Sequence, residues 1–147
     1  MIGCRQNEHH DFDVFEHTLR AYAALEALVH QGGALSSALA NRYTEATPTA
    51  AVLKYAMLLH DIGKLVVAAN KPEAYEGVLA RLAKGDETFH LAERAVYHAD
   101  HAELGGYLLG LWGIPDEVLQ AVAYHHAPQK GRDKGLTALT LVHVANA

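Results

Sequence analysis

Residues 55–65 read YAMLLHDIGKL, where an almost wholly apolar run meets a histidine and an aspartate in tandem. Burying a neutral polar group without a partner costs about 2–7 kcal/mol, and burying a charge costs more. His60 and Asp61 therefore need partners if this stretch enters the core. The residues before them, 48–59, are apolar nearly all round, which is typical of a central helix.

Length and composition restrict the possible classes of protein. The 147 residues suffice for one domain with a proper core, so we expect a single domain over residues 1–147. The single cysteine, Cys4, excludes an intrachain disulfide and favours a cytoplasmic location. No secretory leader is evident and no apolar run approaches the ~20 residues that span a bilayer, so we expect no membrane association. The formal net charge of −5 disfavours broad binding to nucleic acid.

Apolar residues recur at helical spacing along the chain, and no alternating strand pattern is present. We therefore predict an all-α fold of about six or seven helices. The expected helices cover 13–30, 48–61, a short segment from Pro72, 88–112 with a break near Asp100, 114–126 and 136–147. Asp13 is expected to cap the first helix, and Gly63 to break the central one. Residues 34–46 are partly polar and fit either a helix or a mobile excursion.

Histidine is unusually abundant, with 11 residues, and it is the commonest metal ligand in proteins. Five of the expected helices carry a nitrogen or oxygen donor on their buried side. These donors are His17, His60 with Asp61, His101, His125 with His126, and Asn146. Taken singly, an inward histidine is more often a core residue bonded to a carbonyl than a ligand. Taken together with Asp61, they favour a site for Zn, Fe, Mn, Co or Ni over Mg.

The remaining histidines are interpreted differently. His98 shares a helix face with His101, so it could be a supporting partner or an alternative ligand. The others receive the plain structural interpretation: His9, His10, His30, His90 and His143.

The same residues carry a resemblance to a known family. His17, followed by LLHDIGK at 58–64, resembles the HD superfamily of metal-dependent phosphohydrolases, whose signature is the tandem His-Asp. The stretch HAELGGYLLGLWGIPDEVLQAVAYHHAP at 101–128 resembles the HDOD and HD-GYP branches. LVHVANA at 141–147 is similar to the segment in which active members place a closing aspartate. The resemblance implies a compact HD-domain helical bundle over nearly the whole chain.

The resemblance implies one or two divalent ions bridged by Asp61. By position, the ligands of the first ion are His17, His60, Asp61 and Asn146. The second is held by Asp61, His101 and one of His125 or His126, and the other histidine of that pair serves a third ion or the substrate.

The resemblance also implies catalytic roles for Asp61 and Lys64. Lys64 matches the lysine that family members often aim at a phosphate. On the residues alone, Lys64 fits equally well a solvated side chain after a helix stop.

Two departures from the family pattern leave the function open. Asn146 stands where active members have an aspartate, so the first site lacks one charge. The Gly-Tyr-Pro element of HD-GYP proteins is absent after His126, and Ala127-Pro128 with QKGRDKG is closer to HDOD. The chain also lacks the N-terminal part of a full HDOD module, which suggests a compact or truncated one.

Two main hypotheses follow. The first is a metal-dependent phosphohydrolase or phosphodiesterase acting on a nucleotide or cyclic nucleotide. The second is a catalytically silent HDOD-like signalling or interaction module with a residual metal site and a protein partner. A third, an RNA-linked phosphoesterase, comes from the similarity of residues 3–21 to the HD domain of tRNA nucleotidyltransferases, and the acidic net charge disfavours it.

Overall fold

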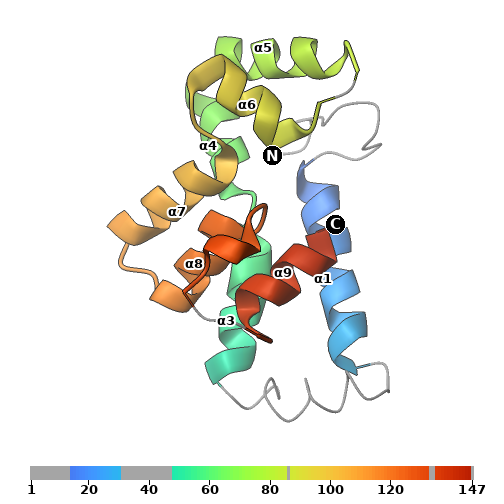
Figure 1. Cartoon of the computed structure of the whole chain (residues 1–147), viewed down its shortest axis with the longest axis vertical. Helices are drawn as coiled ribbons and strands as arrows, with labels where there is room; N and C mark the ends of the chain where they lie inside the picture. Colours follow the sequence, from blue (N-terminus) through green and yellow to red (C-terminus); the bar gives the residue numbers. More distant parts are fainter. Residues whose placement is uncertain (1–13, 31–47, 86, 133–134, 147) are drawn as a thin grey trace.

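The structure is a computed structural model that describes residues 14–30, 48–85, 87–132 and 135–146. All regular structure among these residues is helical, which confirms the all-α prediction. The helices are α1 (Val14–His30), α3 (Pro48–Leu59), α4 (Ile62–Asn70), α5 (Pro72–Leu82), α6 (Phe89–Tyr97), α7 (His101–Leu111), α8 (Asp116–Tyr124), the 3-10 helix η1 (Pro128–Lys130) and α9 (Ala138–Asn146) (Figure 1). The predictions for Asp13 and residues 34–46 lie outside the described residues.

The central helix divides at the His60-Asp61 turn, and a further helix, α4, follows at once. The expectation that Gly63 breaks the helix is therefore wrong, because Gly63 lies inside α4. A Cβ atom on Gly63 would lie 2.1 Å from the backbone oxygen of His101. The missing side chain thus lets α4 cross α7 at backbone contact, which brings the two helices' first turns together.

The predicted break near Asp100 is confirmed, because α6 ends at Tyr97 and α7 begins at His101. Asp100 caps α7: its Oδ1 accepts from the Glu103 backbone N–H at 2.9 Å, and Glu103 reaches back to the Asp100 N–H. This reciprocal capping box satisfies amides that a helix start leaves without partners. It also fixes the place of His101, the first residue of α7.

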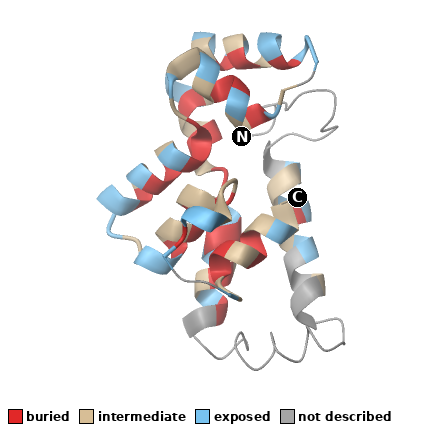
Figure 2. Ribbon diagram, viewed as in Figure 1, coloured by how far each residue is buried: buried red, intermediate tan, exposed pale blue. Residues whose placement is uncertain are grey.

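The described helices pack around two apolar cores. The first includes Met57 of α3, Leu109 of α7 and Val122 of α8, and it also takes residues from α1 and α9. The second is formed mainly by α4, α5 and α6, with Val78 at its centre. In Figure 2, the buried positions lie along the inner sides of α3, α8 and α9 and along α4.

The His60-Asp61 turn lies where one core gives way to the other, because α3 belongs to the first core and α4 to the second. None of the described helices combines the length and apolar composition needed to cross a bilayer.

Candidate metal centre

Two groups of side chains suited to metal binding lie at the junction of the two cores. We call His17, His60 and Asp61 the aspartate cluster, and His101, His125 and His126 the histidine cluster. Within each cluster the potential ligand atoms all lie within 4.8 Å of one another. The structure thus places side chains from α1, the α3–α4 turn, the start of α7 and the end of α8 together.

Asp61 belongs to the aspartate cluster and also reaches the histidine cluster. Its Oδ1 is 3.3 Å from Nε2 of His101 and 3.7 Å from Nε2 of His60, and its Oδ2 is 3.8 Å from Nε2 of His17. The carboxylate is buried, and Oδ1 has no hydrogen-bond partner among the described residues. A buried anionic oxygen of this kind is costly unless a positive charge compensates it.

Asn146, on the last turn of α9, completes the aspartate cluster. Its Oδ1 lies 2.7 Å from Nε2 of His17 and 3.1 Å from Nε2 of His60. An amide oxygen can bind a cation, but it contributes no negative charge. Asn146 therefore lies where a ligand would be needed, and its role as a ligand stays a prediction.

Hydrogen bonds at Nδ1 set the tautomers of three of these histidines. His60 and His125 each donate from Nδ1 to the backbone carbonyl oxygen three residues earlier, at 2.7 and 2.8 Å. His101 donates from Nδ1 to the carboxylate of Glu93 at 2.5 Å. Because each acceptor requires the proton on Nδ1, the lone pair is left on Nε2, which faces the centre.

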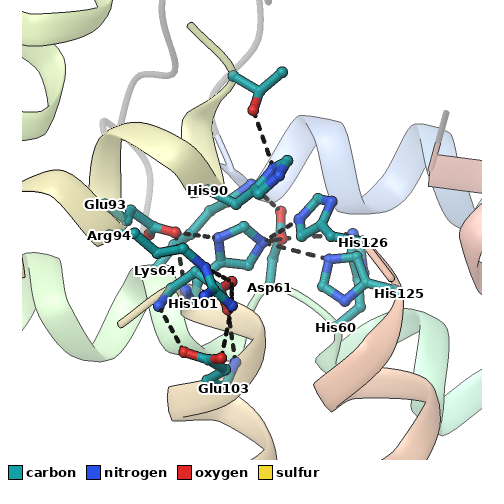
Figure 3. A network of polar contacts seen from close by, with 12 residues as sticks. His60, Asp61, Lys64, His90, Glu93, Arg94, His101, Glu103, His125 and His126 are labelled. Carbon is teal, nitrogen blue, oxygen red and sulfur yellow. Dashed lines mark hydrogen bonds and ion pairs between the residues drawn. The ribbon is translucent and has the colours of Figure 1, made fainter. Parts of the chain in front are cut away.

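The Nε2 atoms of the histidine cluster face one another closely. Nε2 of His101 is 3.3 Å from Nε2 of His125 and 2.9 Å from Nε2 of His126. Figure 3 shows the His101 ring with Glu93 on one side and Asp61 and the two other histidines on the opposite side. Lone pairs facing at these distances repel unless a proton or a cation lies between them. Imidazole nitrogens with one shared carboxylate form a donor set that fits a divalent transition ion.

The electrostatics keep these ligands in the form that binds a metal. Burial lowers the pKa of His125 to about 4 and that of His126 to about 2. Burial also lowers the pKa of His101, with the Lys64 ammonium acting in the same direction. Burial would raise the pKa of Asp61, but Lys64 and the nearby imidazoles hold it well below its ordinary value. At neutral pH, His101, His125 and His126 are thus neutral imidazoles and Asp61 is an ionised carboxylate.

Lys64 is buried against this carboxylate. Its Nζ lies 2.9 Å from Oδ2 of Asp61 and 4.8 Å from the centre of the Phe89 ring. The interpretation of Lys64 as a solvated side chain is wrong, because α4 continues through it and directs it inward. That it contacts a phosphate stays a prediction.

Glu93 was not among the residues predicted for this site. Its side chain is fully buried, and burial raises its pKa to about 7. The signal was available: Phe89, Ala92 and Glu93 form the buried stripe of α6, so a carboxylate stands at an apolar position.

The other histidines whose side chains the structure describes belong to neither cluster. His143 donates from Nδ1 to the backbone oxygen of His125 at 2.6 Å. The ring of His90 stacks on that of His126, with centroids 4.3 Å apart. His98 belongs to neither cluster and is exposed at the end of α6, with a left-handed φ of 64°. His9, His10 and the side chain of His30 lie outside the described residues.

Comparison with known proteins identifies the family. The sequence profile of the HDOD domain matches residues 13–128, so the chain belongs to the HDOD family, a branch of the HD-like superfamily. The match includes both clusters and ends before Asn146.

A curated relative and the solved structures add no function to this family assignment. An uncharacterized protein of Treponema pallidum (strain Nichols) is 28% identical over 69 residues, which is 47% of this chain and 14% of that protein. The aligned part therefore spans a small fraction of the relative. No solved structure matches the chain significantly.

Proposed function

We propose that this HDOD chain is a metal-dependent phosphohydrolase or phosphodiesterase that acts on a nucleotide or cyclic nucleotide. The main support is the position of Asp61, whose carboxylate has Oδ2 near His17 of its own cluster and Oδ1 near His101 of the histidine cluster. In this proposal, Asn146 and the aspartate cluster hold one divalent transition ion. The histidine cluster holds a second ion and shares Asp61 with the first.

Bound ions of this kind supply Lewis acidity, which lowers the pKa of water and neutralises charge on a phosphoryl group. The protein itself contributes charged side chains held at fixed positions. Asp61 stays ionised, and the Lys64 ammonium next to it offers a positive charge for phosphate oxygens. His17 and His126 are only partly buried, so a substrate approaches the centre from their side.

The test uses the full chain. We expect purified protein to contain one to two Fe, Mn, Zn, Co or Ni ions by mass spectrometry, and to hydrolyse bis(p-nitrophenyl) phosphate when Mn²⁺ or Fe²⁺ is added. Asp61→Asn should lose bound metal and turnover together. Asp116→Asn, a change at an exposed aspartate of α8, is the matched control and should retain both. A metal-loaded wild type that hydrolyses neither this ester nor any nucleotide would falsify the enzymatic proposal.

A second function is favoured by Asn146. With an amide in place of a carboxylate, the aspartate cluster binds its cation less tightly, which suits a silent signalling module with a structural metal and a protein partner. Asn146→Asp distinguishes the two functions. We expect this substitution to increase the affinity for the more weakly bound ion about tenfold, because affinity rises with ligand charge. If turnover appears only in Asn146→Asp, the natural chain is the signalling module.

A further inference from the structure

Within the two clusters, the Nδ1 atom of His101 has a different kind of partner from those of His60 and His125. His60 and His125 donate to neutral backbone carbonyls within their own turns, whereas His101 donates to a carboxylate on another helix. The same Oε2 atom of Glu93 also accepts from the backbone N–H of His101 at 2.9 Å. Both side chains have no exposed surface. One carboxylate oxygen thus holds both the backbone and the ring of His101.

The corner between α6 and α7 keeps this pair in place. Arg94, next to Glu93 on α6, pairs with Asp100 at 2.8 Å and with Glu103 at 2.6 Å. Asp100 in turn precedes His101 and caps α7. The ion pairs of Arg94 and the buried Glu93–His101 contact therefore link the same two helices at adjacent residues.

The ring of His101 has little freedom to turn. Phe89 meets it edge-on, with ring centroids 6.1 Å apart and an angle of 74° between the planes. On the backbone side, Gly63 lies so close that even a Cβ atom would overlap with His101. With the ring held in place, its ability to bind a metal depends on which nitrogen carries the proton. Glu93 contacts Nδ1 and so acts on this choice.

We propose that Glu93 is the positioning residue of His101: it holds the imidazole in the Nδ1-protonated tautomer and directs the Nε2 lone pair toward Asp61, His125 and His126. A hydrogen bond from Nδ1 to this Glu93 oxygen leaves the lone pair on Nε2, and a carboxylate partner makes the imidazole a better metal ligand. The histidine cluster is therefore the tighter half of the centre, and the aspartate cluster with its amide is the weaker half. This inference rests on the proposed metal binding and does not depend on turnover.

The tautomer is measured first, on metal-free protein. Long-range ¹H–¹⁵N correlation spectra of the ¹⁵N-labelled full chain distinguish protonated from unprotonated ring nitrogens, and His101→Gln identifies the signals of His101. We expect the wild type to show Nδ1 protonated and Nε2 bare. In Glu93→Gln, which keeps the size but loses the charge, we expect a measurable fraction with the proton on Nε2. A wild type with His101 protonated at Nε2 overturns the inference, even if Glu93→Gln fails to fold.

Cation affinity is measured second, by competition of Zn²⁺ and Co²⁺ with a chromophoric chelator. We expect Glu93→Gln to lower the affinity for the more tightly bound ion about 10–100-fold, the usual effect of losing a hydrogen-bond partner of a ligand histidine. Glu93→Asp retains the charge on a shorter side chain and should restore part of the affinity. Glu117→Gln removes the same charge from the exposed first turn of α8 and should stay within about twofold of wild type.

The outcomes separate the two proposals. If the wild type binds no transition ion, the proposed function fails, and the tautomer of His101 still decides the role of Glu93. If the wild type binds ions and Glu93→Gln binds them equally well, the proposed function stands and the inference about Glu93 is overturned.

Discussion

At the scale of single residues, Lys64 and Asp61 form an ion pair in which both side chains are almost fully buried. Moving two charges out of water costs several kcal/mol each, and their attraction only partly offsets this. Such a pair is poor evidence of stability, but removal of one member leaves the other buried without compensation. Lys64 thus supplies the countercharge of Asp61 when no cation is bound.

The buried ion pair between Lys64 and Asp61 predicts the effect of Lys64→Met, which keeps the length of the side chain and removes its charge. In the presence of a chelator, we expect the free energy of unfolding to fall by about 3–5 kcal/mol. With Co²⁺ or Zn²⁺, we expect a smaller loss, because the cation then compensates Asp61. Urea unfolding with and without metal measures both, and Lys71→Met at an exposed lysine serves as the control. An equal loss in both conditions would show that Lys64 acts through packing alone.

Much of the candidate centre follows from the sequence. Helical periodicity placed the inward donors, and the tandem His60-Asp61 with the later histidine pair suggested one common site. Glu93 was missed because a single glutamate in a helix is usually solvated, and only the neighbouring stripe of α6 marks it as buried. The orientation of Lys64 was missed for another reason: the helix was taken to stop at Gly63, so no inward face was assigned beyond it.

At the scale of helices, the boundaries set by local chemistry were predicted well. Pro72 begins α5, the break at Asp100 separates α6 from α7, and α8 begins directly after Pro115. The error at Gly63 has a tertiary cause. Glycine disfavours a helix interior by about 0.5–1 kcal/mol, and the contact with α7 outweighs that preference. Sequence alone does not show which distant backbone will lie against a glycine.

This contact predicts opposite effects for two glycine substitutions within helices. Gly63→Ala places a Cβ atom 2.1 Å from the backbone oxygen of His101, so α4 and α7 must separate. We expect a loss of about 1–3 kcal/mol in the free energy of unfolding, together with weaker metal binding, because Asp61 and His101 move apart. Gly77→Ala in α5 is the matched control. Its Cβ atom would lie 3.5 Å from Val96 Cγ1, an ordinary contact, so we expect a gain of about 0.5–1 kcal/mol.

Thermal or urea unfolding and a metal titration on both variants test this prediction. Equal stability of Gly63→Ala and wild type would contradict the close crossing of α4 and α7. Loss of metal binding in Gly77→Ala would show that any change of glycine, and not this crossing, disturbs the centre.

At the scale of the whole molecule, the polar centre lies between two apolar cores. The histidines of the centre sit at or near helix ends that meet at this junction, and three of them are fully buried. Burial lowers the pKa of His17, His101, His125 and His126, so folding and the protonation of these side chains oppose one another. The stability of the whole chain must therefore depend on pH.

The sign of this dependence follows from three groups. The pKa of His125 falls from 6.5 to about 4 on folding, and that of His126 from 6.5 to about 2, so the unfolded chain binds up to two more protons as pH falls from 6.5 to 4.5. The pKa of Glu93 rises from 4.5 to about 7, so the folded chain binds one more proton there. The difference of 2 − 1 = 1 proton favours the unfolded state in acid, and the lowered pKa values of His17 and His101 add to it.

We therefore expect the metal-free protein to lose unfolding free energy as pH falls from 6.5 to 4.5, with a slope that steepens toward about 1.4 kcal/mol per pH unit, the value for one net proton. Urea unfolding at several pH values in the presence of a chelator measures this slope. His125→Gln removes one of the buried imidazoles and should flatten it. Metal-loaded protein should show a steeper loss, because protons compete with cations for the same nitrogens. A stability that stays constant or rises in acid would contradict neutral, buried imidazoles at the junction of the two cores.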